Sequence, residues 1–155
     1  MATVLSRAVR EAAGMAEPQP GAERVLVYVD GSDASMRAVD RALAIAGEGG
    51  RVTALVVVPP RLDRAAVSQF EIEDADLDVR FAEELAAKVV ERAAACGRAL
   101  QPLVLRGPPV DVIVDRARSR DFDVVLVARK PGPRFVADLS ETLRRKPGLP
   151  LEVVG

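Results

Sequence analysis

The chain has 155 residues, of which 49% are hydrophobic and 29% are charged, and this balance is typical of one globular domain. Its 22 basic and 23 acidic residues nearly cancel, so no overall field attracts nucleic acid or an anionic membrane, and we expect neither as a partner. A single cysteine and the absence of histidine exclude an internal disulfide, a histidine-dependent triad and a histidine-bearing zinc site.

The first 22 residues differ from the rest of the chain. Small apolar residues recur at helical spacing between residues 4 and 12, and Pro18, Pro20 and Gly21 then end any helix. We predict an N-terminal extension over residues 1–22, either frayed or docked on this subunit or a partner, followed by one domain over residues 23–155. No apolar run reaches the ~20 residues of a membrane span, and charged residues interrupt the start, so we expect a cytoplasmic location.

Short apolar runs alternate with helical patterns through the rest of the chain. The run at 25–29 is continuously apolar, as in a strand buried on both faces, and Ser32 can cap the helix that follows. Strands are predicted at 25–29, 52–58, 99–105, 124–127 and 151–154. Apolar residues at helical spacing predict four intervening helices. The first follows the Ser32 cap and has its inward stripe over 36–46, and the second has its stripe from Leu77 through Phe81 and ends near residue 97. The third starts at Pro109 with its stripe over 110–117, and a short fourth helix carries Leu139 and Leu143.

The order of the strands follows from their connections and from one proline. Alternating strands and helices with short connections require parallel pairing and right-handed crossovers. Pro102 cannot donate to a ladder, which places the third strand at a sheet edge. We therefore predict an α/β fold, a doubly wound five-stranded parallel sheet of order 3-2-1-4-5 with helices on both faces. Ligands of such sheets bind beyond the carboxyl ends of the strands, at the switch point between the first and fourth.

The predicted switch point brings together the residues that follow the first and fourth strands. These are Asp30, Gly31 and Ser32 after the first strand, and Ala128, Arg129, Lys130 and Arg134 after the fourth. The three cations could bind a small anionic ligand, or they could form a solvated basic loop. The carboxylate of Asp30 could face a ligand, or it could accept hydrogen bonds from its own turn.

An ordered series of short segments runs through residues 24–154. The series is Val-Leu-Val-Tyr-Val-Asp-Gly-Ser at 25–32 with Ser35 following, Arg-Gly-Pro-Pro at 106–109, Asp-Val-Val-Leu-Val at 123–127, Ser-Glu at 140–141 and Leu-Glu-Val-Val at 151–154. Each segment is common by itself, but in this order they resemble the universal stress protein family. The resemblance implies the Rossmann-like fold shared with the adenine nucleotide alpha hydrolases.

The loop after the fourth strand departs from the pattern of the family's ATP-binding branch. The resemblance implies the pattern Gly-x2-Gly-x9-Gly-Ser/Thr, whose amides and final hydroxyl hold phosphates. Here Ala128 and Pro131 stand at the first two glycines, and anchoring on Ser140 puts Ala137 and Asp138 at the last pair. Proline lacks the amide hydrogen, and alanine adds a Cβ. Two unit charges ~4 Å apart repel by about 1 kcal/mol in water and about 4 kcal/mol at an effective dielectric of 20, so Asp138 should lower phosphate affinity on the order of tenfold to a thousandfold.

Two functions follow from the resemblance. It implies that Asp30 meets the nucleotide base or ribose and that Val57 packs on adenine, although Val57 is also explained as core. We predict a regulatory or stress-response binding protein without catalysis or a cofactor, which does not bind ATP in the family's standard manner. The alternative is a stress protein that binds ATP, AMP or another adenine nucleotide through Asp30, Val57 and a modified basic loop.

The fifth predicted strand indicates a protein partner. Leu151, Val153 and Val154 would form an apolar sheet edge, and the resemblance implies a homodimer through this strand.

Two other folds with a similar strand order are disfavoured by the sequence. A phosphoacceptor receiver domain needs an aspartate at the end of the third strand, where this chain has Leu105 and Arg106. A flavodoxin-like carrier needs a run of donors after the first strand and aromatic residues, and aromatics are only 3% of this chain.

Overall fold

The computed structural model describes residues 24–58, 69–129 and 139–155, with the backbone alone for residues 69–77. The predicted extension at 1–22 lies outside this described part, as do Lys130, Arg134 and Asp138. The strands are β1 (Arg24–Tyr28), β2 (Arg51–Val58), β3 (Gln101–Arg106), β4 (Val124–Ala128) and β5 (Leu151–Val154). The helices are α2 (Asp33–Ala46), α3 (Gln69–Ala95), α4 (Pro109–Arg118) and α5 (Leu139–Arg144).

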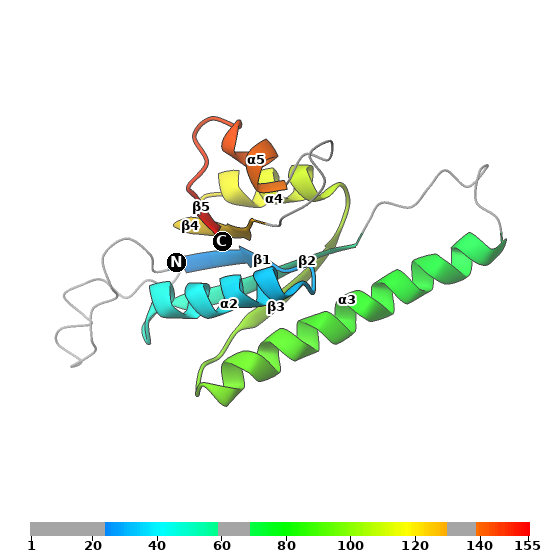
Figure 1. Cartoon of the computed structure of the whole chain (residues 1–155), viewed down its shortest axis with the longest axis horizontal. Coiled ribbons are helices and arrows are strands. Elements are labelled where there is room, and N and C mark those ends of the chain that lie inside the picture. Colours follow the sequence, from blue (N-terminus) through cyan, green and yellow to red (C-terminus); the bar gives the residue numbers. More distant parts are fainter. Residues whose placement is uncertain (1–23, 59–68, 130–138) are drawn as a thin grey trace.

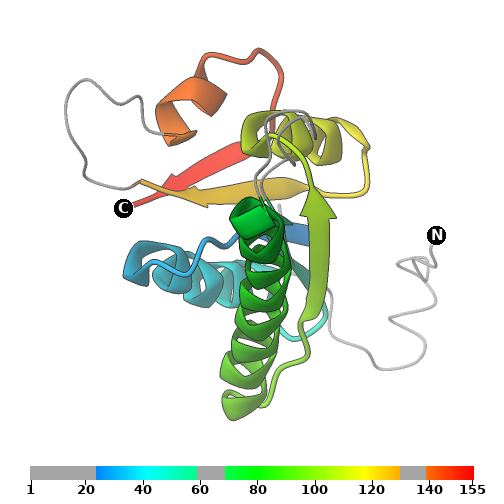
Figure 2. The ribbon, with the colours of Figure 1, turned by 90° about the vertical axis from the view of Figure 1, so that its right-hand side faces the viewer.

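The five strands form one parallel sheet of order β3-β2-β1-β4-β5, which confirms the predicted fold class (Figure 1). Val25 of β1 lies opposite Val52 of β2 on one side and Val124 of β4 on the other. Helices α2 and α3 cover one face of the sheet, and α4 and α5 cover the other (Figure 2). Among the described residues, no helix is long and apolar enough to cross a membrane.

The position of β1 at the centre of the sheet explains why its sequence is continuously apolar and does not alternate with polar residues. Val25 and Val27 pack on the α2/α3 face, whereas Leu26 packs on the α4/α5 face, and all three are fully buried. A strand covered by helices on both sides leaves no polar position in its interior. Alanines at helical spacing along α2, such as Ala38 and Ala42, let that helix lie close to the sheet.

Several boundaries differ from the sequence prediction by one or two residues, and the start of α3 differs by more. β3 begins at Gln101 rather than near 99, with Pro102 opposite Ala54 on the expected edge strand. α3 begins at Gln69, well before the apolar stripe that predicted a helix from residue 77. Polar residues can continue a helix beyond the stripe that packs on the sheet, so periodicity underestimated its length.

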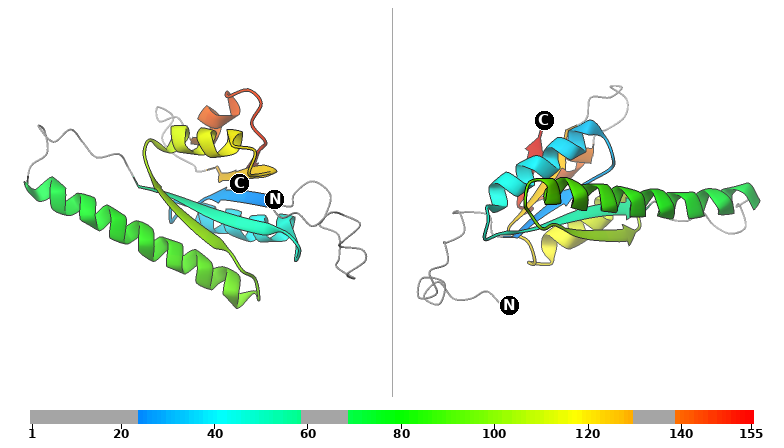
Figure 3. Two further views of the ribbon diagram at one scale, coloured as in Figure 1. Left: turned by 180° about the vertical axis from the view of Figure 1, so that it is seen from behind. Right: turned by 90° about the horizontal axis from the view of Figure 1, so that it is seen from below.

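Helix α3 is longer than the sheet that it covers. Its 27 residues span about 40 Å at 1.5 Å per residue, whereas the eight residues of β2 span about 26 Å. The amino-terminal half of α3 therefore projects past the carboxyl ends of the strands (Figure 3). Phe81, which the sequence placed in the inward stripe, is 58% exposed. The stripe extends to a residue that the sheet no longer covers.

Candidate functional site

The predicted switch point lies where β1 and β4 end side by side. The two strands pair in register from Val25 with Val124 to Val27 with Leu126. Both strands end at the same edge of the sheet, so the described residues that follow them lie at that edge. The described part of this site comprises Asp30, Gly31, Ser32, Val57, Ala128 and Arg129.

The turn after β1 is held by its own polar side chains. Asp30 Oδ1 accepts hydrogen bonds from the backbone N–H of Ser32 at 2.9 Å and from its hydroxyl at 2.6 Å. Ser32 in turn caps α2, because its Oγ accepts the N–H of Ser35 at 3.1 Å. The hydroxyl of Ser35, which is buried, donates to the carbonyl of Ser32 at 2.9 Å. Turn chemistry therefore accounts for one carboxylate oxygen of Asp30 and for the Ser32 hydroxyl.

Gly31 has two reasons to be glycine. Its φ of +89° lies in the region that side chains disfavour. A Cβ placed there would lie 3.3 Å from Cζ of Phe81 and 3.7 Å from Cδ2 of Leu85. The ring of Phe81 thus lies against the turn at the edge of the candidate site. This contact has no signal in the sequence, because a helical stripe does not say which residue lies level with the ends of the strands.

Tyr28 is a second residue that the sequence analysis did not assign to the site. Its ring packs on the α4/α5 face of the sheet, as the side chain of Val57 does, and both are partly buried. Burial raises the pKa of the Tyr28 phenol above its ordinary value of 10.0, and the nearby charge of Asp30 raises it further. The phenol therefore stays protonated at neutral pH and can donate a hydrogen bond. A polar ring as the last residue of a buried strand was the available signal.

The β4 side of the site is closed by strand pairing. Ala128 is 5% exposed and packs in the core of the α2/α3 face, opposite Val154 of β5. The N–H of Arg129 donates to the carbonyl of Val154 at 2.7 Å. The stem of Arg129 lies against Gly155, where a Cβ would come within 2.9 Å of the arginine Cβ. Arg129 is therefore an exposed cation at the carboxyl end of the β4–β5 pair.

The comparisons agree with this geometry. A family model described as the universal stress protein family matches residues 21–145. The universal stress protein UspA from Lactobacillus plantarum is 23% identical, covers 85% of this chain and 97% of its own, and superposes with a TM-score of 0.72. The universal stress protein from Archaeoglobus fulgidus in complex with dAMP is 20% identical, with coverages of 85% and 97% and a TM-score of 0.61.

A universal stress protein from a plant shares the same fold. The universal stress protein from Arabidopsis thaliana with AMP bound is 17% identical, with coverages of 84% and 90% and a TM-score of 0.57. A search of curated proteins finds no match to this chain. The family model spans most of the described residues, and the solved structures share the sheet and its helices. The chain belongs to the universal stress protein family.

Proposed function

We propose that this protein is a non-catalytic, regulatory member of its family that does not hold ATP in the family's standard manner. The proposal rests on the hydrogen bonding of the backbone immediately after β4. The Arg129 amide donates to the carbonyl of Val154, so it is not available to a phosphate. The sequence then supplies Pro131, which has no amide hydrogen, and Asp138, which replaces a hydroxyl with a negative charge.

Phosphate binding of this type depends on unpaired backbone donors and on the absence of nearby negative charge. Amides at a loop or helix start act together, because several N–H groups converge on one phosphate. The loss of N–H donors removes attraction to a phosphate, and the added carboxylate repels it, so both changes weaken phosphate binding. The absence of histidine from the sequence also removes the usual general base, which supports a binding function over a hydrolytic one.

A second candidate function is binding of an adenine nucleotide through its nucleoside end. The turn that presents Asp30 is intact, and Tyr28 and Val57 lie on the same face of the sheet near it. Two of the solved relatives are complexes with dAMP and with AMP. A monophosphate would require less of the damaged loop than ATP does, and exposed Arg129 could supply one cation.

Isothermal titration with ATP, ADP and AMP, with and without magnesium, separates the two functions. We expect no binding of ATP at micromolar concentrations, and we expect Asp138→Ser to raise ATP affinity roughly tenfold or more by removing the repulsion. Asp33→Asn is the matched control, since Asp33 is exposed on the first turn of α2. Micromolar binding of ATP to the unmodified protein would overturn the proposal. Loss of that binding in Asp30→Asn, which keeps the turn's acceptor, would establish the second candidate instead.

We also propose that the protein forms a homodimer through β5. This strand ends the order of the described sheet, and each of its residues is partly exposed. Leu151 packs on the α4/α5 face and Val154 on the α2/α3 face, where Glu152 pairs with Arg41 of α2 at 3.2 Å. Three of the four side chains of the strand are apolar. An apolar outer strand is a surface that a second copy can cover.

A further inference from the structure

A cavity of about 420 Å³ lies at the amino ends of the strands, at the opposite end of the sheet from the switch point. It is lined by the starts of β1 and β2, by the segment that enters β3 and by the loop between α4 and β4. We call it the amino-edge cavity. Its volume falls within the range of small-molecule sites.

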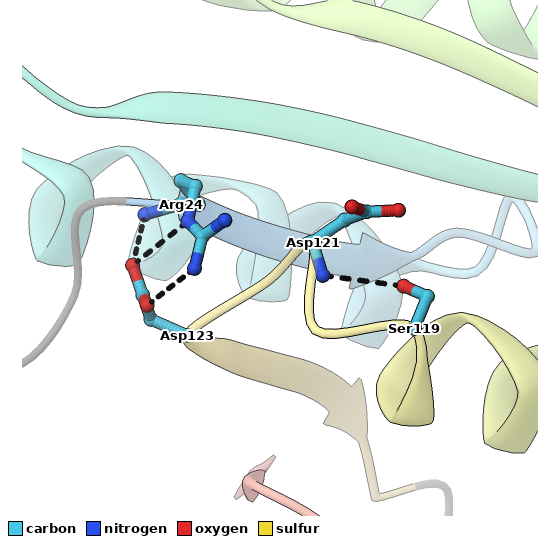
Figure 4. Close-up of polar contacts among 4 residues, drawn as sticks. All are labelled: Arg24, Ser119, Asp121 and Asp123. Atoms are coloured by element: carbon cyan, nitrogen blue, oxygen red, sulfur yellow. Dashed lines mark hydrogen bonds and ion pairs between the residues drawn. The ribbon is translucent and has the colours of Figure 1, made fainter. Parts of the chain in front are cut away.

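One wall of the amino-edge cavity is fixed by a pair of residues far apart in the sequence. The guanidinium of Arg24 donates to Asp123 Oδ1 at 3.1 Å, and the backbone N–H of Arg24 donates to Oδ2 at 2.8 Å (Figure 4). The N–H of Asp123 donates back to the carbonyl of Arg24 at 2.8 Å. The charge of Arg24 is therefore balanced, and the loop that leads into β4 is held against β1.

The same loop presents a carboxylate to the cavity. Arg120 has a φ of +67°, and its left-handed conformation reverses the chain after α4. The N–H of Asp121 then donates to the Ser119 hydroxyl at 3.3 Å. The Asp121 carboxylate points away from both Ser119 and the Arg24–Asp123 pair (Figure 4). Within the described part of the chain, this carboxylate has no ion-pair partner.

A positive charge lines the same cavity from β2. Arg51 is the first residue of β2, lies opposite Arg24 in the sheet and is exposed. Among the described residues it, too, has no ion-pair partner. The amino-edge cavity therefore carries one cation and one anion that are not paired with each other.

The remaining lining gives the amino-edge cavity an apolar part. Val52 and Leu100 are buried, at 2% and 8% exposure, and the ring of Phe122 is partly buried. A ligand with a single charge would be attracted by one of Arg51 and Asp121 and repelled by the other. A ligand with both charges and an apolar group would satisfy the whole lining.

We propose that the amino-edge cavity binds a small zwitterion, a free α-amino acid with an apolar side chain. The ammonium group pairs with Asp121, the carboxylate pairs with Arg51, and the side chain packs on Phe122 and Leu100. A guanidinium and a carboxylate group form charge-assisted hydrogen bonds, which are the stronger kind. This site lies at the opposite end of the sheet from the switch point, so the proposal does not rest on the proposed function.

Titration of the full chain with leucine tests the proposal, with two ligands that each lack one charge. N-Acetylleucine has no ammonium group and leucinamide has no carboxylate, and we expect each to bind at least about tenfold more weakly than leucine. Backbone amide shifts of Gln101 and Phe122 in NMR spectra should follow the titration, while those of Asp30 and Ser32 should not. Absence of heat and of shifts at millimolar leucine, or shifts confined to the switch point, would overturn the proposal.

Charge-removing variants assign the two roles. Asp121→Asn and Arg51→Gln should each lower leucine affinity at least about tenfold. Their matched controls are Asp111→Asn, at the opposite end of α4, and Arg37→Gln on α2, both of which are exposed and should leave binding unchanged. Thermal unfolding shows that each variant is folded. Leucine affinity that is equal in all four folded variants would contradict the assignment of both charges.

Discussion

Gly31 links the backbone of the candidate site to the helix that covers it. The residue adopts a φ of +89°, and Phe81 and Leu85 of α3 lie where its side chain would extend. Any side chain at this position would disturb both the turn that carries Asp30 and the packing of α3. At the residue scale, therefore, the shape of the site depends on the lack of a Cβ at Gly31.

Replacing Gly31 with alanine should destabilise the protein more than the same change at Gly97. Gly97 has a similar φ of +72°, but no atom lies within 4 Å of a Cβ there. The left-handed conformation costs about 1–2 kcal/mol at either position, and only Gly31→Ala adds a tight contact, 3.3 Å from Cζ of Phe81. Thermal unfolding measures both, with about 2–4 °C of Tm per kcal/mol for a chain of this size. Equal losses of Tm would show that Phe81 moves aside freely.

At the scale of single elements, α4 ends in an unusual way. Its C-cap is Ser119, and the next residue, Arg120, takes the left-handed conformation that glycine usually supplies at this point. The turn directs the chain into the loop that carries Asp121 and then into β4. A residue with a Cβ makes this reversal at a cost that a glycine would not incur.

Arg120→Gly should therefore stabilise the protein by roughly 0.5–1 kcal/mol, because the relief of strain exceeds the added entropy of the unfolded chain. Chemical denaturation measures the change in the free energy of unfolding. Arg120→Ala is the matched control, since it removes the same charged side chain and keeps the Cβ. A gain in the alanine variant equal to that in the glycine variant would assign the effect to the side chain and not to the backbone.

For the whole molecule, the question is what covers the outer edge of β5. Val125 N–H donates to the carbonyl of Pro150, and Arg129 N–H donates to that of Val154. Hydrogen bonds alternate along a strand, so the N–H groups of Leu151 and Val153 point away from β4. The N–H of Leu151 donates to the carbonyl of Leu149 at 2.8 Å, so the proposed dimer would use the outward N–H of Val153.

Val153→Pro should convert the dimer to a monomer, because it removes an outward N–H and leaves the β4–β5 hydrogen bonds in place. Light scattering measures the mass, and circular dichroism reports whether the fold is retained. Val153→Thr, which keeps both the branched shape and the N–H, should remain dimeric. A monomeric mass for the unmodified protein would refute this dimer.

Sequence predicted the architecture because the architecture depends on local patterns. The fully buried run of β1 and the proline of β3 together determined the centre and one edge of the sheet. The amino-edge cavity had no such signal, because Arg24, Arg51 and Asp121 are separated along the chain and belong to no motif. The contact of Phe81 with Gly31 was equally hidden, since it depends on where a long helix crosses the ends of the strands.

The ion pair between Arg24 and Asp123 joins residues 99 positions apart, and this separation bears on how the chain folds during synthesis. β1 is made first among the strands, yet its neighbour β4 is made only after β2 and β3. The 95 residues between the end of β1 and the start of β4 take roughly 5–20 seconds to translate at 5–20 residues per second, so the β4-facing edge of β1 stays open for that time. During that interval the nascent half-sheet exposes an apolar strand, and the ribosome-bound chain is at its most vulnerable to aggregation.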